Sequence, residues 1–200
     1  MATLYVVRHG NTFDAGDVVT RVGGRTDLPL SASGRTQAAA LGTHFADTRF
    51  DAALASPLQR TRATARAILS MRTDAPALLI RTFLREIDYG PDENQPEEAV
   101  IARLGAAALK EWDEDGTPPK GWIVDPGAIR AGWSSLLQEI TAMPPEANVL
   151  VVTSNGTARF LPDVVDGAPA SLDRKLKTGA WGEIRVTPDR AAITDWNRRP

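Results

Sequence analysis

The sequence contains no cysteine and only two histidines among its 200 residues. Without thiols the chain has no disulfide, no cysteine-ligated zinc and no thiolate nucleophile, and it shows no sign of secretion. An excess of basic residues is also missing, because 23 Lys and Arg stand against 25 Asp and Glu, for a formal net charge of −2. A chain of this charge lacks the positive field that attracts nucleic acid or an anionic membrane surface.

Long apolar runs are absent as well. No stretch approaches the roughly 20 apolar residues that span a bilayer, and the first residues lack the basic and apolar pattern of a secretory leader. We therefore expect a cytoplasmic protein that binds a small molecule, with no nucleic acid and no membrane as partner. Apolar residues make up 42% and charged residues 24%, an ordinary globular composition that fits one domain over 1–200.

The most informative stretch is 4–12, Leu-Tyr-Val-Val-Arg-His-Gly-Asn-Thr. Its apolar run is typical of a buried strand in a parallel sheet, and open α/β sheets place ligand-handling side chains where such strands end. Neutral imidazole is a competent nucleophile near neutral pH, and a guanidinium presents planar paired donors to phosphate. His9 is therefore the candidate nucleophile, with Arg8 beside it. By itself the motif fits a hydrogen-bonded structural histidine equally well.

A second anion-binding pattern lies at 56–65. Residues 51–55 predict a short strand, after which Ser56 and Gln59 have the spacing of a capping box and Pro57 suits the first helical position. The first turn of such a helix offers free N–H groups and the positive end of the helix dipole to an anion. Arg60 adds a guanidinium at that place.

The motifs Arg-His-Gly-x-Thr at 8–12 and Ser-Pro-Leu-x-Arg-x-x-x-Thr-Ala at 56–65 resemble those of the histidine phosphatase (phosphoglycerate mutase-like) superfamily. A weaker match at 24–34 leads into a helix predicted over 31–47 with Ser31 as its N-cap. The resemblance implies that His9 attacks a phosphoryl group and forms a phosphohistidine. It also implies that phosphate oxygens are held by a set of residues near His9: Arg8, Arg60, Asn11 and Thr12.

Residues 84–90 resemble the superfamily segment Leu-x-Glu-x-x-x-Gly, which carries the proton donor, and this points to Glu86. A donor to a leaving oxygen needs a carboxyl group whose pKa is raised by burial or by a neighbouring phosphate. A salt bridge between Glu86 and a nearby arginine is the alternative interpretation, and Asp88 is the fallback acid.

The glycine-containing loop 21–25 supplies candidate substrate-binding residues. Its glycines permit close backbone approach, and its arginines could face an anionic ligand. We select Arg21 and Gly24 for this role, whereas Arg25 is expected to be a solvated loop arginine. The basic residues at 174–177 are expected to serve solubility, and Trp112 is expected to pack in a core.

The segment 91–146 carries little that matches the superfamily. Asn94 and Glu97 have capping-box spacing ahead of a helix predicted to reach about residue 114. A loop at 116–121 and a second helix at 127–142 follow. We expect this segment to form a helical insert that caps the site and shapes the substrate pocket.

The strand predicted at 148–153 ends in Ser-Asn-Gly, where the superfamily resemblance implies a second histidine before the glycine. This chain has Asn155 there, which assigns it to a branch with asparagine in place of the second active-site histidine. An asparagine amide can donate a hydrogen bond to phosphate but cannot carry charge. The lost charge assistance, about 1.5–3 kcal/mol, would slow the reaction by about one to two orders of magnitude.

Together these patterns predict a three-layer α/β/α sandwich with a mostly parallel central sheet, closed by a hairpin at 183–186 and 191–194. The predicted function is that of a histidine acid phosphatase-type hydrolase acting on a small-molecule phosphomonoester. No Walker-type loop or metal-ligand cluster is recognisable, so no metal and no cofactor are expected. Two alternatives stay open: a phosphomutase of the same superfamily, and a non-catalytic pseudoenzyme that binds a phosphate ligand.

Overall fold

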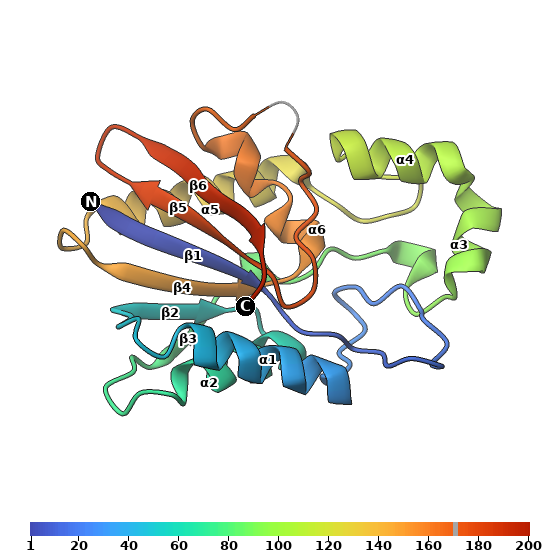
Figure 1. Ribbon diagram of the computed structural model, residues 1–200. Helices are drawn as coiled ribbons and strands as arrows, with labels where there is room; N and C mark the ends of the chain where they lie inside the picture. The colour runs from blue at the N-terminus through green and yellow to red at the C-terminus, as the bar shows by residue number, and fades with distance from the viewer. Residues whose placement is uncertain (170–171) are drawn as a thin grey trace.

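The computed structural model describes residues 1–169 and 172–200 and has a six-stranded sheet at its centre (Figure 1). The strands lie in the order β3-β2-β4-β1-β5-β6. The first four are parallel, and β5 and β6 form an antiparallel hairpin at one edge. Their bounds are β1 (Ala2–Arg8), β2 (Ala52–Ala55), β3 (Leu78–Ile80), β4 (Asn148–Thr153), β5 (Trp181–Val186) and β6 (Ala191–Arg198).

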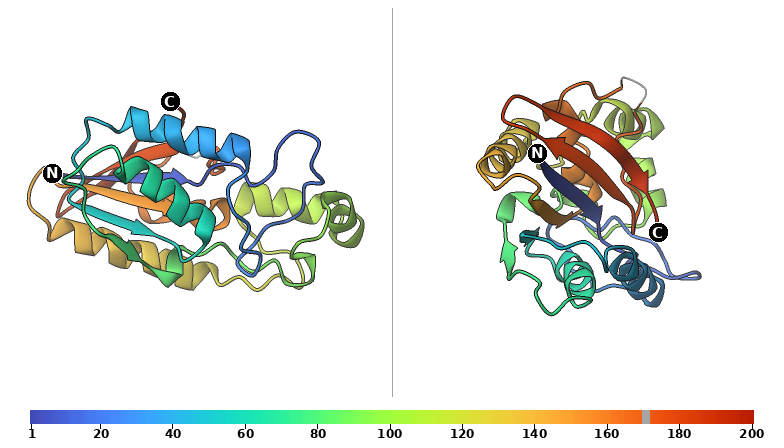
Figure 2. Two further views of the ribbon diagram at one scale, coloured as in Figure 1. Left: turned by 90° about the horizontal axis from the view of Figure 1, so that it is seen from below. Right: turned by 60° about the vertical axis from the view of Figure 1, so that its left-hand side comes forward.

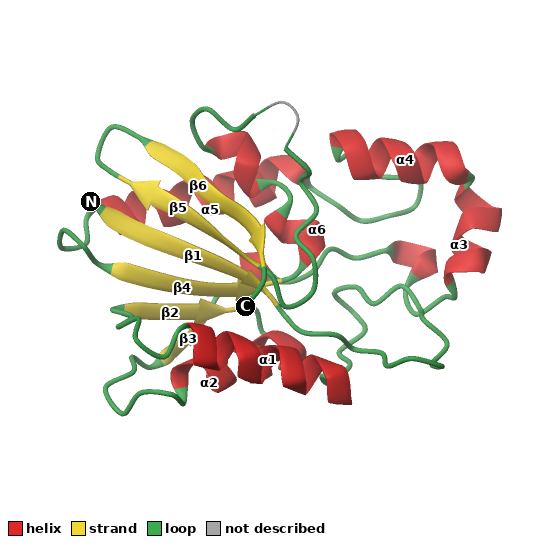
Figure 3. Ribbon diagram, in the orientation of Figure 1, coloured by secondary structure: helices red, strands yellow, loops and turns green. Residues whose placement is uncertain are grey.

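Helices cover both faces of this sheet (Figures 1 and 3). One face packs against α1 (Ala32–His44) and α2 (Gln59–Leu69), and the other against α5 (Pro126–Thr141) and α6 (Asn155–Ala158). Figure 2 shows α5 and the α1–α2 pair on opposite sides of the sheet. The predicted three-layer α/β fold with a mostly parallel sheet is confirmed. In the described part of the chain, no helix is both long and apolar enough to cross a membrane.

Strand β1 is central and buried on both faces, which explains its nearly continuous apolar sequence. Leu4 and Val6 pack in the core beneath α5, whereas Val7 packs in the core beneath α1 and α2. The parallel register pairs Arg8 with Thr153 of β4, and the His9 N–H donates to the Thr153 carbonyl at 3.2 Å. The carboxyl ends of β1 and β4 therefore meet, and each end passes directly into a polar loop or turn.

The helix starts agree only partly with the predictions. Ser31 caps α1 as predicted, since its Oγ accepts from the Gly34 N–H at 3.1 Å. The capping box predicted for α2 is wrong, because the helix begins at Gln59, and the Ser56 hydroxyl is hydrogen-bonded to Thr61 instead. A carboxylate remote in sequence takes its place: Asp27 accepts from the Gln59 N–H at 2.8 Å.

The segment 91–146 divides into two parts. Its first half forms α3 (Glu97–Leu104) and α4 (Ala106–Asp115), which lie beyond the carboxyl ends of the strands, at the right of Figure 1. One continuous helix was expected here, but Gly105, with a φ of 79°, separates the two. Its second half forms α5, whose Trp133 belongs to the core against the sheet. Short 3₁₀ helices complete the chain at Thr82–Leu84, Gly90–Asp92 and Leu161–Val164.

Gly10 brings the loop after β1 into backbone contact with the start of α1. A Cβ at Gly10 would lie 2.3 Å from the Gly34 carbonyl oxygen, a backbone atom that cannot move alone. We expect Gly10→Ala to lower the free energy of unfolding by about 1–3 kcal/mol, measured by urea denaturation. Gly127→Ala is the matched control, because a Cβ there meets only the Asp125 side chain, at 3.3 Å. Equal losses in the two variants would contradict this account.

Candidate active site

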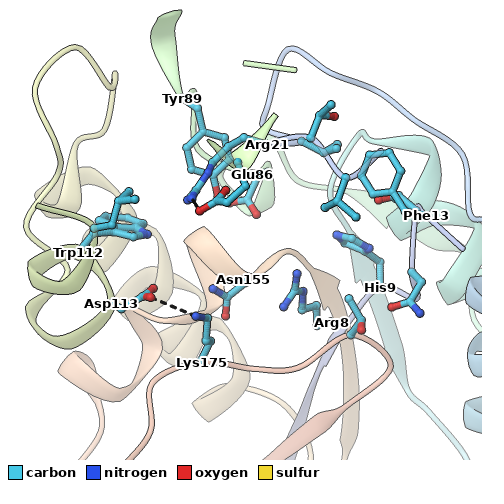
Figure 4. A pocket seen from close by; sticks show the side chains of 18 residues that line it. Arg8, His9, Phe13, Arg21, Glu86, Tyr89, Trp112, Asp113, Asn155 and Lys175 are labelled. Carbon is cyan, nitrogen blue, oxygen red and sulfur yellow. Dashed lines mark hydrogen bonds and ion pairs between the residues drawn. The ribbon is translucent and has the colours of Figure 1, made fainter. Parts of the chain in front are cut away.

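A pocket of about 450 Å³ opens at the carboxyl ends of β1 and β4 (Figure 4). Its walls come from the loop after β1, the 19–22 loop, the 86–89 segment, α3 and α4, and the segment 175–178. Most of the predicted site residues line it: Arg8, His9, Asn11, Thr12, Arg21, Glu86 and Asn155. Arg60 and Gly24 do not line it.

His9 lies at the end of β1 with only 6% of its surface exposed. Its Nδ1 is 2.7 Å from the Gly10 carbonyl oxygen. Because a carbonyl only accepts hydrogen bonds, Nδ1 carries the ring proton and Nε2 keeps its lone pair. Burial, assisted by the charges of Arg60 and Arg8, lowers the pKa of His9 well below its ordinary value. His9 is therefore a neutral imidazole whose basic nitrogen is Nε2.

Arg60 is fully buried behind His9. Its Nε donates to His9 Nε2 at 3.2 Å, and its terminal nitrogens donate to the carbonyls of Thr26, at 2.9 Å, and Gly23, at 3.2 Å. Burial lowers the pKa of Arg60. No carboxylate of the described residues lies within ion-pair distance of this guanidinium. Its charge is thus directed at the space around Nε2.

Arg8 lines the pocket beside His9. Its Nη1 donates to the Leu176 carbonyl at 2.9 Å, while its Nε is buried without a hydrogen-bond partner in the described structure. Burial lowers the pKa of Arg8, and the Glu86 carboxylate opposes this shift. The pocket therefore contains a guanidinium held by one backbone oxygen, with further N–H groups that have no acceptor.

Glu86 is 7% exposed and faces the same space. Its two carboxyl oxygens accept from backbone N–H groups, one from Ile87 at 2.9 Å and one from Gly156 at 3.3 Å. The salt bridge considered for Glu86 does not form among the described residues, and burial raises the pKa of this carboxyl group. Asp88, by contrast, pairs with Arg25 at 2.9 Å and does not line the pocket.

Asn155 begins α6 directly after β4. Its Oδ1 accepts from the Leu176 N–H at 2.9 Å, which leaves the amide NH₂ as the donating group of this side chain. Leu176 also accepts from Arg8 through its carbonyl. Leu176, a buried residue late in the chain, therefore orients both Arg8, at the end of β1, and Asn155, at the start of α6.

Three further predicted residues differ in what they can offer. Asn11 uses its backbone N–H for Gln37 and its side-chain NH₂ for the Ser33 hydroxyl, at 2.8 and 3.2 Å. Thr12 lines the pocket. The Gly24 N–H donates to the Ile87 carbonyl at 2.7 Å, and a Cβ there would lie 2.5 Å from the Glu86 carbonyl oxygen. Gly24 thus lets its loop press against the Glu86 backbone.

The part of the pocket away from His9 was largely missed by reasoning from the sequence. Tyr89, Leu109 and Asp113 line it without a motif that marks them, and Trp112 lines it in addition to packing in the core as predicted. Lys175 was expected to serve solubility, but it lines the pocket and pairs with Asp113 at 3.1 Å. Asp113 and Lys175 are 62 positions apart in the sequence, and only the fold brings them to one wall of the pocket.

Comparisons with known proteins agree with this arrangement. A family model described as the histidine phosphatase superfamily (branch 1) matches residues 4–199. The uncharacterized phosphatase PhoE of Bacillus subtilis is 35% identical over 198 residues, which cover 98% of this chain and 95% of PhoE. A 2,3-bisphosphoglycerate-dependent phosphoglycerate mutase of Rhizobium etli is 34% identical over 207 residues, which cover 98% of this chain and 97% of the mutase.

Among solved structures, a mycobacterial glucosyl-3-phosphoglycerate phosphatase has the same fold, with a TM-score of 0.82. It is 20% identical in sequence, and the alignment covers 99% of both chains.

Proposed function

Because the chain belongs to the histidine phosphatase superfamily, branch 1, whose relatives named above are phosphatases and a mutase, we propose that it hydrolyses a small-molecule phosphomonoester through a phosphohistidine on His9. The observation that carries this proposal is the state of the imidazole. Its Nδ1 proton is held by the Gly10 carbonyl, so Nε2 is unprotonated at the end of β1, next to a pocket where Arg8 has no carboxylate partner among the described residues.

In the first step the Nε2 lone pair forms a bond to phosphorus while the bond from phosphorus to the ester oxygen breaks. The Nδ1 proton stays on the ring, where the Gly10 carbonyl stabilises the positive charge of the phosphorylated imidazole. Glu86, whose raised pKa favours the protonated form, gives its proton to the leaving alcohol oxygen.

In the second step water attacks phosphorus and gives a proton to the Glu86 carboxylate. The N–P bond breaks, its electron pair returns to Nε2, and inorganic phosphate leaves. Together the two steps restore the free Nε2 and the protonated Glu86, and water is the only reactant consumed besides the ester.

The phosphate oxygens are proposed to be held by Arg8, Arg60 and the Asn155 amide. The Arg60 Nε–H donates to His9 Nε2 in this structure. When Nε2 bonds to phosphorus, this N–H would instead donate its hydrogen bond to a phosphate oxygen. Thr12, which lines the pocket, is proposed to donate its hydroxyl hydrogen to a phosphate oxygen. Asn11 is assigned a positioning role, since its donors already hold Gln37 and Ser33 on α1.

Asn155 stands at the position where the superfamily resemblance implies a second histidine before Gly156. We expect Asn155→His to raise the rate of phosphate release by about tenfold, because an imidazolium adds a charged donor to the transition state. Phosphate release from an aryl phosphate at several pH values checks this. Asn155→Ala, which removes the donor, is the control and should lower the rate. If Asn155→His folds normally and is no faster than wild type, the missing imidazole does not limit the reaction.

The test of the function itself is phosphate release from a panel of phosphomonoesters by the wild-type protein without added metal. A mutase, suggested by the Rhizobium relative, would instead yield an isomeric phosphoester without free phosphate. A non-catalytic binder, suggested by Asn155, would show a thermal shift with phosphate ligands but no turnover above a His9→Ala control. Release of phosphate that depends on His9 would support the phosphatase over both.

A further inference from the structure

Two ion pairs form opposite walls of the part of the pocket that lies away from His9. On one side Arg21 pairs through its Nη2 with the Glu97 carboxylate. On the other, the Lys175 ammonium lies 3.1 Å from the Asp113 carboxylate, the pair drawn with a dashed line in Figure 4. All four side chains line the pocket. Each cation at this end thus already has an acid beside it.

The first pair is fixed in place by its surroundings. The Arg21 side chain is only 16% exposed, and its guanidinium lies 5.4 Å from the centre of the Tyr89 ring and 5.3 Å from that of Trp122. Its backbone N–H donates to the Gln95 carbonyl at 2.9 Å, just before α3. The contact with Glu97 is therefore part of how the 19–22 loop joins α3, and Arg21 cannot swing freely toward a ligand.

The second pair, Lys175 and Asp113, has a further cation beside it, because Arg159 contacts Asp113 from beneath the pocket wall. Arg159 is buried, does not line the pocket, and lies over the Trp112 ring with its guanidinium carbon 4.3 Å from the ring centre. Its Nη2 lies 3.1 Å from the Asp113 carbonyl oxygen and 3.6 Å from Asp113 Oδ1. The Asp113 carboxylate thus lies between two cations, Lys175 in the pocket and Arg159 beneath it.

The positive charge available to a ligand is therefore concentrated near His9. Of the three cationic side chains that line the pocket, Arg8, Arg21 and Lys175, only Arg8 has no carboxylate partner in the described residues. A second anionic group at the far end would have to displace Glu97 or Asp113 from its cation and then face the displaced carboxylate. Such unfavourable like-charge contacts are a common way to reject a ligand.

Building on the proposed phosphatase function, we propose that Glu97 and Asp113 determine substrate specificity by excluding a second anionic group. The substrate is then a monophosphate ester of an uncharged alcohol. The phosphate lies at Arg8 and His9, and the alcohol part lies between the two ion pairs. There its hydroxyl groups meet charged donors and acceptors, and its carbon skeleton packs near Tyr89 and Leu109.

Glycerol 3-phosphate and 3-phosphoglycerate form a matched pair of probes, because the first has a hydroxymethyl group where the second has a carboxylate. We expect the wild type to have at least a tenfold higher kcat/KM for glycerol 3-phosphate. Glu97→Gln and Asp113→Asn free Arg21 and Lys175, and each should shift the ratio of the two kcat/KM values toward 3-phosphoglycerate by about tenfold. Glu139→Gln is the control, since Glu139 pairs with Arg81 at 2.8 Å away from the pocket.

Binding of the same two probes to the His9→Ala protein, with and without each acid substitution, reports charge discrimination without turnover. An unchanged ratio of Kd values in both acid variants, or a wild type that prefers 3-phosphoglycerate, would overturn the specificity proposal. Absence of turnover on any phosphomonoester would instead remove the phosphatase function, and the Kd ratio would still decide whether these acids exclude a second anion. Thermal unfolding of each variant verifies that it is folded.

Discussion

His9→Ala is expected to lower kcat for phosphate release by roughly four to six orders of magnitude, the scale seen when an enzyme loses its nucleophile. Among the described residues that line the pocket, His9 alone carries an imidazole, and its Nε2 accepts from Arg60, so alanine leaves no group to form the proposed covalent intermediate. Malachite-green assays on an aryl phosphate measure the rate. Denaturation after brief reaction with a radiolabelled substrate should trap acid-labile label on the wild type and none on the variant.

The other histidine provides a matched control for this substitution. His44 is the last residue of α1 and is exposed, with its ring edge-on to Phe45 and tilted against Trp181, and it does not line the pocket. His44→Ala should keep wild-type turnover and the label. Label that persists in His9→Ala, or disappears in His44→Ala, would place the phosphohistidine elsewhere.

Glu86→Gln is expected to lower kcat/KM by about 10²- to 10⁴-fold for an alkyl phosphate, which needs a proton on its leaving oxygen. The loss should be far smaller for p-nitrophenyl phosphate, because that leaving group departs as a stable anion. Measuring kcat/KM of wild type and Glu86→Gln on both substrates tests whether Glu86 donates a proton to the leaving oxygen. Asp88→Asn is the control, since Asp88 holds Arg25 and does not line the pocket. Equal losses on both substrates would argue against proton donation by Glu86.

The dependence of activity on pH should reflect the titration of both Glu86 and His9. Burial raises the pKa of Glu86, so the protonated acid persists above its ordinary range, and activity on alkyl phosphates falls as pH rises through that value. Burial lowers the pKa of His9, so the neutral nucleophile persists below the ordinary range of histidine, and activity falls as pH drops through the lowered value. In Glu86→Gln the alkaline limb should vanish, while the acid limb remains. An alkaline limb unchanged in this variant would belong to another group.

The sequence predicted those parts of the protein that short-range patterns determine. Strands β1 and β4 are apolar runs that end in polar residues, and in a parallel sheet such ends meet, so His9 and Asn155 could be placed together without a structure. The predicted start of α2 was wrong because Asp27, 32 positions away in the sequence, accepts from the Gln59 N–H. Patterns of neighbouring residues cannot reveal such a distant partner.

The far wall of the pocket was unpredictable for a related reason. Asp113 lies in the last turn of α4, where an acidic residue on an exposed helix surface is an equally good explanation, and Lys175 stands among basic residues typical of solvated loops. Their importance depends on tertiary pairing across 62 positions, and nothing in either stretch signals the other. The pocket near His9 follows from motifs, whereas the pocket wall that would select the alcohol follows from the fold.

Because the Leu176 backbone hydrogen-bonds both Arg8 and Asn155, the order in which the chain is synthesised affects when the pocket forms. The Leu176 backbone holds Arg8, at the end of β1, and Asn155, at the start of α6, and its side chain is fully buried. During synthesis the ribosome releases the strand with His9 long before Leu176 emerges, and domains with such long-range contacts fold slowly. The nascent chain therefore carries the proposed nucleophile before Arg8 and Asn155 are oriented. The two side chains are oriented together only after the last quarter of the chain has docked, so under the proposed function an unfinished chain would not act on phosphate esters.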